Sequence, residues 1–450
     1  MINKLPVTIK ETKEGLMKKK FSAVNLVDEY LARIEKNKGL NAFITVSSEE
    51  AYKKAKQIDL SLQDLPLLGV TVAHKDLFLT KGVRTTAGSK VLESYVPVYS
   101  ATVVERMEKA GAIMIGKTNC DAWAHGASGE NSDFGPTLNP NNKDYVPGGS
   151  SSGSAASVSA GLTLIATGTD TGGSVRQPAS FCGVVGLKPT YGAVSRYGII
   201  AMASSLDCPG VFGNCVTDVE TVFNVIKGQD GYDATVTNHQ LPITNHKLRI
   251  GIPKEYFAEG LDPEVEKSVI EASQILKKKG VELVDVSLPN TKHAVEVYYI
   301  IQPAEVSSNL GRYDEIRYGE DRALFGDEAK RRIMLGTYVL SAGYYDTYHL
   351  KAQKVRSLII QDFNEAFSKV DAIIAPVSPT AAFKLGEKTS DPLKMYLADI
   401  LTAPANLAGI PGLAVPNGKN KQGLPLGFQL IGPKFSEPVL FELGKLYERF

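Results

Sequence analysis

The sequence is poor in cysteine and contains no long hydrophobic run. Its four cysteines show no Cys-X-X-Cys spacing; they are Cys120, Cys182, Cys208 and Cys215. This scatter argues against a disulfide framework or a zinc site and favours a reducing compartment. Nowhere do about 18 apolar residues run together, and residues 1–13 lack the apolar stretch of a signal peptide. We therefore expect a cytoplasmic protein that does not contact the membrane.

An excess of charge of either sign is also absent. Fifty Lys and Arg residues against 49 Asp and Glu residues leave a formal charge of +1. Nucleic-acid binding by the chain itself is therefore not expected. The composition, with 43% hydrophobic and 22% charged residues, is that of a globular protein with a sizeable core.

Internal repeats and Pro/Gly/Ser-rich linkers are missing too. By length alone, 450 residues suggest two or three domains. Because no linker divides the chain, we predict a single domain over residues 1–450. Within it, the region from about residue 252 to residue 380 is a candidate subdomain or insertion.

What the sequence does contain is an alternation of helical and strand patterns. Apolar residues at helical spacing from Val27 to Ile34, behind the N-cap candidate Ser22, indicate one helix. A second helix is indicated from Val265 to Leu276. Short apolar or alternating runs indicate strands at residues 67–73, 113–115, 162–166, 281–286, 371–376 and 412–415. The alternation predicts an α/β fold.

Two segments are rich in glycine and serine. Residues 148–154 read Gly-Gly-Ser-Ser-Ser-Gly-Ser, and residues 168–176 read Gly-Thr-Asp-Thr-Gly-Gly-Ser-Val-Arg. On its own the second segment is more typical of a tight turn than of a catalytic loop whose N–H groups face a developing negative charge. No lysine follows the glycines as a P-loop requires. Residues 149–153 match the Gly-X-Ser-X-Gly nucleophile elbow, but residues 141–147 read as a loop, whereas an elbow directly follows a strand.

A third segment, Ala73-His74-Lys75-Asp76, completes a known pattern. Two serines, Ser150 and Ser174, are 24 residues apart, and residues 176–183 and 186–190 continue the pattern after them. Together these segments resemble the amidase signature family. The resemblance implies a large mixed central sheet covered by helices on both sides, and a Ser–Ser–Lys triad that cleaves amides.

The same resemblance implies a role for each member of the triad. Ser174 is the nucleophile, Lys75 is the base, and Ser150, held in the family by a cis peptide bond, passes protons between them. The implied oxyanion hole consists of the N–H groups of Thr171, Gly172, Gly173 and Ser174. Lys75 must be neutral to act, and burial favours the neutral amine. His74 is predicted to be structural, because adjacent side chains of a strand face opposite ways.

Further stretches resemble one branch of the family, in which the amidase is one component of a tRNA-dependent amidotransferase. They are residues 40–45, 191–198, 250–257, 331–336 and 341–346. This branch implies glutamine as substrate and ammonia as the product delivered to a partner. It also implies a heterotrimer with B and C subunits. ATP and Mg²⁺ serve the partner's reaction on misacylated tRNA, which this chain meets only through the partner. No cofactor or metal is expected in this chain.

Glutamine recognition is implied at three further positions. The family holds the α-carboxylate with an arginine and the α-amino group with an aspartate, helped by a tyrosine. The matching residues are Arg332, Asp399 and Tyr298. An arginine fork suits a carboxylate geometrically. The alternative for each is a surface ion pair or an ordinary core aromatic residue.

Two departures from the family pattern concern the pocket. Ser152 stands where glycine is common, and Asp121-Ala122-Trp123-Ala124-His125 replaces a segment that more often carries Glu, Phe and Met. Two other functions stay open at this point. One is a free-standing amidase for another amide, and the second is a catalytically inactive scaffold of a tRNA-modifying complex.

Overall fold

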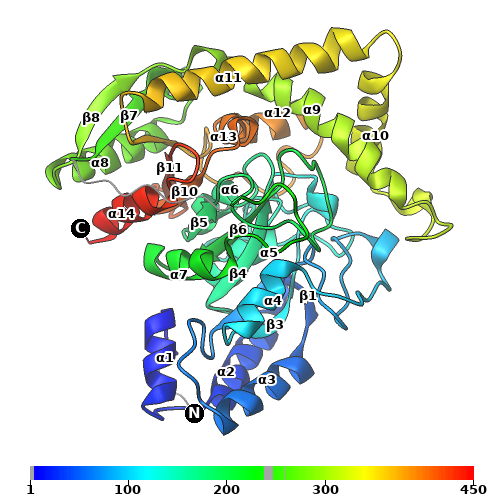
Figure 1. The fold of residues 1–450 in the computed structure, drawn as a ribbon, viewed down its shortest axis with the longest axis vertical. Coiled ribbons are helices and arrows are strands. Elements are labelled where there is room, and N and C mark those ends of the chain that lie inside the picture. Colours follow the sequence, from blue (N-terminus) through cyan, green and yellow to red (C-terminus); the bar gives the residue numbers. More distant parts are fainter. Residues whose placement is uncertain (1–4, 238–246, 259, 450) are drawn as a thin grey trace.

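A computed structural model describes residues 5–237, 247–258 and 260–449. In this part of the chain, eleven strands form one sheet in the order β1-β3-β2-β4-β6-β5-β10-β11-β9-β7-β8 (Figure 1). The strands are β1 (Phe43–Val46), β2 (Thr71–Lys75), β3 (Ile113–Thr118), β4 (Ile165–Asp170), β5 (Val185–Lys188), β6 (Cys208–Gly213), β7 (Arg249–Pro253), β8 (Glu282–Val286), β9 (Ala372–Pro376), β10 (Gly412–Lys419) and β11 (Pro425–Ile431).

The sheet is mixed. Strand β2 pairs in parallel with β3 and β4, and β7 pairs in parallel with β8 and β9. From β4 through β6, β5, β10 and β11 to β9, each strand is antiparallel to the next in this order, and β1 is antiparallel to β3. The predicted α/β class and the mixed sheet are confirmed. Strands β8 and β9, from the region 252–380, belong to this same sheet.

The α-helices lie on both faces of the sheet (Figure 1). They are α1 (Ile9–Met17), α2 (Ala23–Lys36), α3 (Ser48–Leu60), α4 (Thr102–Lys109), α5 (Ser152–Ser159), α6 (Arg176–Cys182), α7 (Val216–Ile226), α8 (Pro263–Lys278), α9 (Ala294–Asn309), α10 (Asp327–Leu340), α11 (Lys351–Phe367), α12 (Pro392–Tyr396), α13 (Ala403–Ala408) and α14 (Glu437–Glu448). None of the helices in the described residues is long and apolar enough to cross a membrane.

Side-chain size differs between the two faces of the central strands. Val72 and Ile165 pack in the main core with α4, α7, α8 and α14. Their neighbours Ala73 and Ala166 face the other way and pack with α5 and α6. Because successive strand side chains alternate between faces, the small alanines let the short helices α5 and α6 approach the sheet closely. Each of these two helices begins two residues after one of the predicted catalytic serines, Ser150 and Ser174.

Most predicted elements are present, with shifted boundaries. The helix behind Ser22 is α2, where Ser22 and Asn25 form a capping box, and the helix from Val265 is α8. The strand predicted over residues 67–73 begins only at Thr71. Gly69 has a φ of +69°, a left-handed conformation that interrupts the extended chain. The strand predicted at 162–166 is likewise displaced, to β4.

Candidate active site

Lys75 ends strand β2 with its amine fully buried. Its Nζ lies 2.8 Å from Ser150 Oγ, 3.0 Å from Ser151 Oγ and 2.9 Å from Thr169 Oγ1. Burial, which penalises the charged form, lowers the pKa of Lys75 to about 8. A substantial fraction of the amine is therefore neutral near pH 8, as a proton acceptor requires.

The hydroxyl groups around Lys75 are not equivalent. Ser151 Oγ donates to the carbonyl oxygen of Thr169 at 3.2 Å and accepts from the N–H of Thr169 at 3.3 Å. Its proton is therefore directed away from Lys75. Ser150 Oγ makes no hydrogen bond within the described residues other than that with Lys75. Ser150 is consequently the hydroxyl that can donate its proton to a neutral Lys75.

The segment before Ser150 is shaped by close backbone contacts. The Gly149–Ser150 peptide bond is cis. The N–H of Gly149 donates to Gln177 Oε1 at 2.9 Å. A Cβ at Gly149 would lie 2.1 Å from Asp121 Oδ2, so only glycine fits. Asp121 in turn accepts from the N–H groups of Gly129 and Asn131. Residues 126–131 are thus fixed against the turn that carries Ser150.

Ser174 lies in the loop between β4 and α6. The N–H of Ser151 donates to the carbonyl oxygen of Ser174 at 3.3 Å, which places the two serine segments side by side. The Ser174 side chain is nearly buried, with 8% of the residue exposed. In the described part of the chain, the N–H groups of Gly172, Gly173 and Ser174 donate no hydrogen bond to the protein. They are available to a ligand oxygen.

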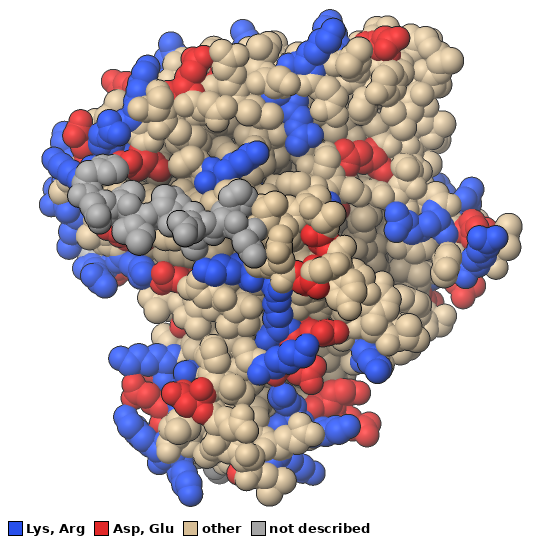
Figure 2. All heavy atoms as spheres, in the orientation of Figure 1, with Lys and Arg blue, Asp and Glu red and all other residues tan. Residues whose placement is uncertain are grey.

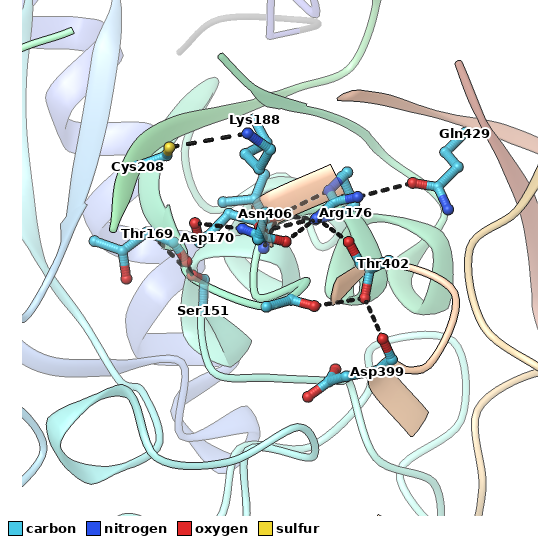
Figure 3. A network of polar contacts seen from close by, with 12 residues as sticks. Ser151, Thr169, Asp170, Arg176, Lys188, Cys208, Asp399, Thr402, Asn406 and Gln429 are labelled. Atoms are coloured by element: carbon cyan, nitrogen blue, oxygen red, sulfur yellow. Dashed lines mark hydrogen bonds and ion pairs between the residues drawn. The ribbon is translucent and has the colours of Figure 1, made fainter. Parts of the chain in front are cut away.

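A buried ion pair between Asp170 and Arg176 joins the two ends of this loop (Figure 3). Arg176 donates from Nε to Asp170 Oδ2 and from Nη2 to Asp170 Oδ1, both at 3.1 Å. Arg176 also donates to the side-chain oxygens of Asn406 and Gln429 and to the carbonyl oxygen of Thr402. Burial alone would raise the pKa of Asp170, but the Arg176 guanidinium and its neighbours hold this pKa at about 2. Asp170 also accepts from the N–H of Val175, so the ion pair fixes both ends of the loop.

The predicted substrate residues divide between two places. Tyr298, on α9, packs against Gly172, where an added Cβ would lie 2.7 Å from the tyrosine hydroxyl oxygen. Asp399 lies beside Gly173, whose added Cβ would be 3.3 Å from Asp399 Oδ1. Burial raises the pKa of Asp399 to about 8. Both side chains therefore adjoin the loop that carries Ser174.

Arg332 lies on α10, where it already has protein partners. It donates from Nε to Glu328 Oε1 at 2.7 Å and from Nη1 to Gln302 Oε1 at 2.8 Å. Its guanidinium also lies near the rings of Tyr299 and Tyr396. Arg332 is buried, which excludes the alternative of a surface ion pair.

Arg332 and these aromatic rings border a cavity of about 230 Å³. Its other wall is the segment from His125 to Ser128. Ser128 N lies 2.7 Å from the Cβ position of Gly149, so this wall backs directly onto the turn that holds Ser150. Arg332 and the turn that carries Ser150 therefore lie on opposite sides of the segment 125–128 and the cavity that it borders.

His74 and Ser152 face away from the triad. His74 Nδ1 lies 3.1 Å from Thr167 Oγ1, and burial, with the nearby charge of Lys117, lowers the pKa of His74 to about 3. A base at neutral pH is not expected from this ring, in agreement with a structural role. Ser152 Oγ lies 3.1 Å from Thr137 Oγ1; its side chain packs on Gly129, not on Lys75.

Sequence reasoning missed several residues that shape the site. Thr169 contacts Lys75 only because β2 and β4 are adjacent and parallel. Asp121 and Gln177 hold the turn at Gly149, and Thr402 donates to the carbonyl oxygen of Gly172 at 2.6 Å. The one signal in the sequence was that Asp170 and Arg176 are the charged residues of a segment otherwise rich in glycine, threonine and serine.

Within the described residues, no group of three or more His, Cys, Asp or Glu side chains could hold a metal ion.

Comparisons with known proteins agree on one family. A family model described as Amidase matches residues 25–441. The glutamyl-tRNA(Gln) amidotransferase A subunit of Koribacter versatilis is 51% identical, over 98% of both chains. The protein of that name from Carboxydothermus hydrogenoformans is also 51% identical, over 98% of this chain and 97% of its own length. The crystal structure of the glutamyl-tRNA(Gln) amidotransferase A subunit from Thermotoga maritima has a TM-score of 0.84 and 42% identity, and covers 100% of this chain and 95% of its own.

Proposed function

The chain belongs to the amidase family, and we propose that it is the glutamine-hydrolysing subunit of a tRNA-dependent amidotransferase. The observation that carries the proposal is the buried contact of Lys75 Nζ with Ser150 Oγ at 2.8 Å, in a chain 51% identical to named amidotransferase A subunits. Ser174 acts as nucleophile, Ser150 as proton relay and Lys75 as base.

The first half of the reaction forms an acyl-enzyme. Ser174 Oγ attacks the side-chain amide carbon of glutamine and passes its proton to Ser150 Oγ, which gives its own proton to the neutral amine of Lys75. The N–H groups of Gly172, Gly173 and Ser174 stabilise the oxyanion that develops on the amide oxygen. The proton then returns from Lys75 through Ser150 to the leaving nitrogen, so that the C–N bond breaks and ammonia departs.

The second half releases glutamate. A water molecule attacks the ester carbon of acylated Ser174, and Lys75 again accepts a proton through Ser150. The C–O bond to Ser174 breaks, and the returned proton restores its hydroxyl. No redox change occurs and no cofactor takes part. The chain's own residues supply every proton transfer.

The proposed function requires partner subunits, because the ammonia that this chain releases is used in their reaction. The relatives are named as subunits of an amidotransferase, and we propose B and C subunits that complete a heterotrimer and use ATP and Mg²⁺ on misacylated tRNA. Basic and acidic side chains are interspersed on the face drawn in Figure 2, and the formal charge is only +1. We therefore expect the partner, not this chain, to bind the tRNA phosphates.

Exposed hydrophobic side chains support such an assembly. They gather on α10 and on the turn that follows it; they are Met334, Leu335, Tyr338, Tyr344, Tyr345 and Tyr348. Met334 is 72% exposed. Contiguous exposed apolar surface is typical of protein–protein contacts.

Ammonia release tests this function directly. The chain, by itself and with its partner subunits, is incubated with glutamine, and glutamate and ammonia are measured. We expect slow hydrolysis by the isolated chain and a marked rise with the partner, ATP and misacylated tRNA. Absence of hydrolysis in every condition would overturn the proposal.

A further inference from the structure

His125 is buried without a hydrogen-bonding partner. The residue has 0% exposure, and neither Nδ1 nor Nε2 bonds to any described residue. A buried polar group that lacks a partner is destabilising. An imidazole with both nitrogens unpaired therefore needs an explanation beyond packing.

The position of His125 supplies that explanation. It lines the cavity of about 230 Å³ that Arg332 also borders. His125 is the first residue of the cavity wall formed by residues 125–128. The last residue of this wall, Ser128, packs against Gly149, which precedes the relay serine Ser150. The unpaired ring thus lines the same cavity as Arg332, on the wall whose far end packs against the turn that carries Ser150.

The unused hydrogen-bond donors at the cavity suit a carboxylate there, although its lining carries both acidic and basic side chains. Burial and the positive charge of Arg332 hold the pKa of His125 well below its ordinary value, so the ring stays neutral and carries one N–H donor. Arg332 uses Nε and Nη1 on Glu328 and Gln302, and within the described residues its Nη2 has no hydrogen bond. Gln302 Nε2 is also unpaired. Unused donors on neighbouring side chains match the acceptor oxygens of an anion.

We propose that His125 contacts the substrate and donates a hydrogen bond to the carboxylate bound by Arg332, so that it selects amides that carry an α-carboxylate. The inference rests on the proposed function and adds a specificity-determining residue to it. It also gives a role to the segment 121–125, where this chain departs from the family pattern.

The test compares glutamine with 4-aminobutanamide, which has the same amide but lacks the carboxylate. His125→Met keeps a similar volume and removes both nitrogens. In the assembled complex we expect the KM for glutamine to rise about tenfold or more, as for a lost hydrogen bond to a charged group, with kcat changed little. The KM for 4-aminobutanamide should change by less than about twofold. His125→Gln, which restores a donor, should recover part of the loss.

Two controls separate the outcomes. His293→Met, at an exposed histidine, should leave both substrates unaffected. Thermal unfolding of His125→Met should show no loss of stability, because the variant removes buried unpaired nitrogens. An unchanged KM for glutamine, or equal losses on both substrates, would overturn the role of His125 while the parent protein still hydrolyses glutamine. If the parent itself hydrolyses no glutamine, the proposed function fails, and the role of His125 fails with it.

Discussion

The amine of Lys75 contacts the hydroxyl of Ser150 at 2.8 Å, with both side chains fully buried. Burial lowers the pKa of Lys75 to about 8, as the proposed base requires. The hydrogen bonds of the neighbouring Ser151 leave Ser150 as the hydroxyl proposed to relay a proton. Variants of the lysine, the serines and the residues that hold the substrate therefore have distinct expected effects.

The first prediction concerns the need for a neutral amine on Lys75. Lys75→Arg is expected to be nearly as inactive as Lys75→Ala, since a guanidinium stays protonated at any workable pH. Both variants should lose at least about 100-fold in kcat, the contribution typical of general-base catalysis. The loss in kcat is measured as the rate of ammonia release from glutamine. Lys81→Arg, at an exposed lysine, is the control and should leave the rate unchanged. Substantial activity in Lys75→Arg would mean that the lysine acts only as a positive charge.

The pH dependence follows from the pKa of about 8 for Lys75. Below that pH the amine is protonated and inactive, so kcat/KM should rise with pH and level off above about 8. Because burial also raises the pKa of Asp399 to about 8, glutamine would report both groups. Butyramide, which lacks both the α-amino group and the carboxylate, isolates Lys75. A flat profile for butyramide from about pH 6 to about pH 9 would contradict the role of the neutral amine.

Substrate binding is tested by Arg332→Ala and Asp399→Ala. Each removes a contact to a charged group of glutamine, and each should raise the KM for glutamine by about 10- to 100-fold. The effect on butyramide should be much smaller. Steady-state kinetics on both substrates measure the difference. Equal losses on both would make these residues structural.

The nucleophile is identified by covalent labelling. A glutamine-derived electrophile is expected to label Ser174, and Ser174→Ala should abolish the labelling. Ser151→Ala should retain it, because Ser151 Oγ is bonded to the backbone of Thr169. Peptide mass analysis locates the label. A label on Ser151 would favour the nucleophile-elbow interpretation instead.

The Asp170–Arg176 pair makes a prediction about stability. Asp170→Asn leaves a fully buried guanidinium without its counter-charge, which should lower the free energy of unfolding by about 3–5 kcal/mol. Lys394→Met, which breaks an exposed pair with Asp391, should change it little. Urea unfolding compares the two variants. A similar small effect in both would show that the pair does not hold the loop.

The sequence alone allowed prediction of the α/β class, and its resemblance to the amidase signature family predicted that Ser150 lies beside Lys75. The contact of Thr169 with Lys75 could not be predicted, since it depends on the parallel pairing of β2 with β4. Glu328 is four residues before Arg332 on α10, so that their ion pair is visible as a helical spacing. The burial of that ion pair could not be predicted from the sequence, because it depends on how α9 and α10 pack.

The unpaired ring of His125 was equally hidden. The sequence marked residues 121–125 as a departure, but only packing shows that Trp123 turns toward Tyr313 and Phe325 while His125 lines the cavity. Periodicity and motif spacing do not predict the surroundings of a side chain when these depend on contacts between segments far apart in the sequence.

In the function proposed for it, this chain makes ammonia for a partner's reaction on tRNA. The most direct measurement supplies glutamine labelled at its amide nitrogen to the complex with partner subunits, ATP and misacylated Glu-tRNA. We expect the label in Gln-tRNA, its loss in Ser174→Ala, and recovery of amidation by that variant when free ammonium is added. Full glutamine hydrolysis by the isolated chain, unchanged by partner and tRNA, would contradict the account in favour of a free-standing amidase. Labelled Gln-tRNA that persists in Ser174→Ala would instead indicate an inactive scaffold.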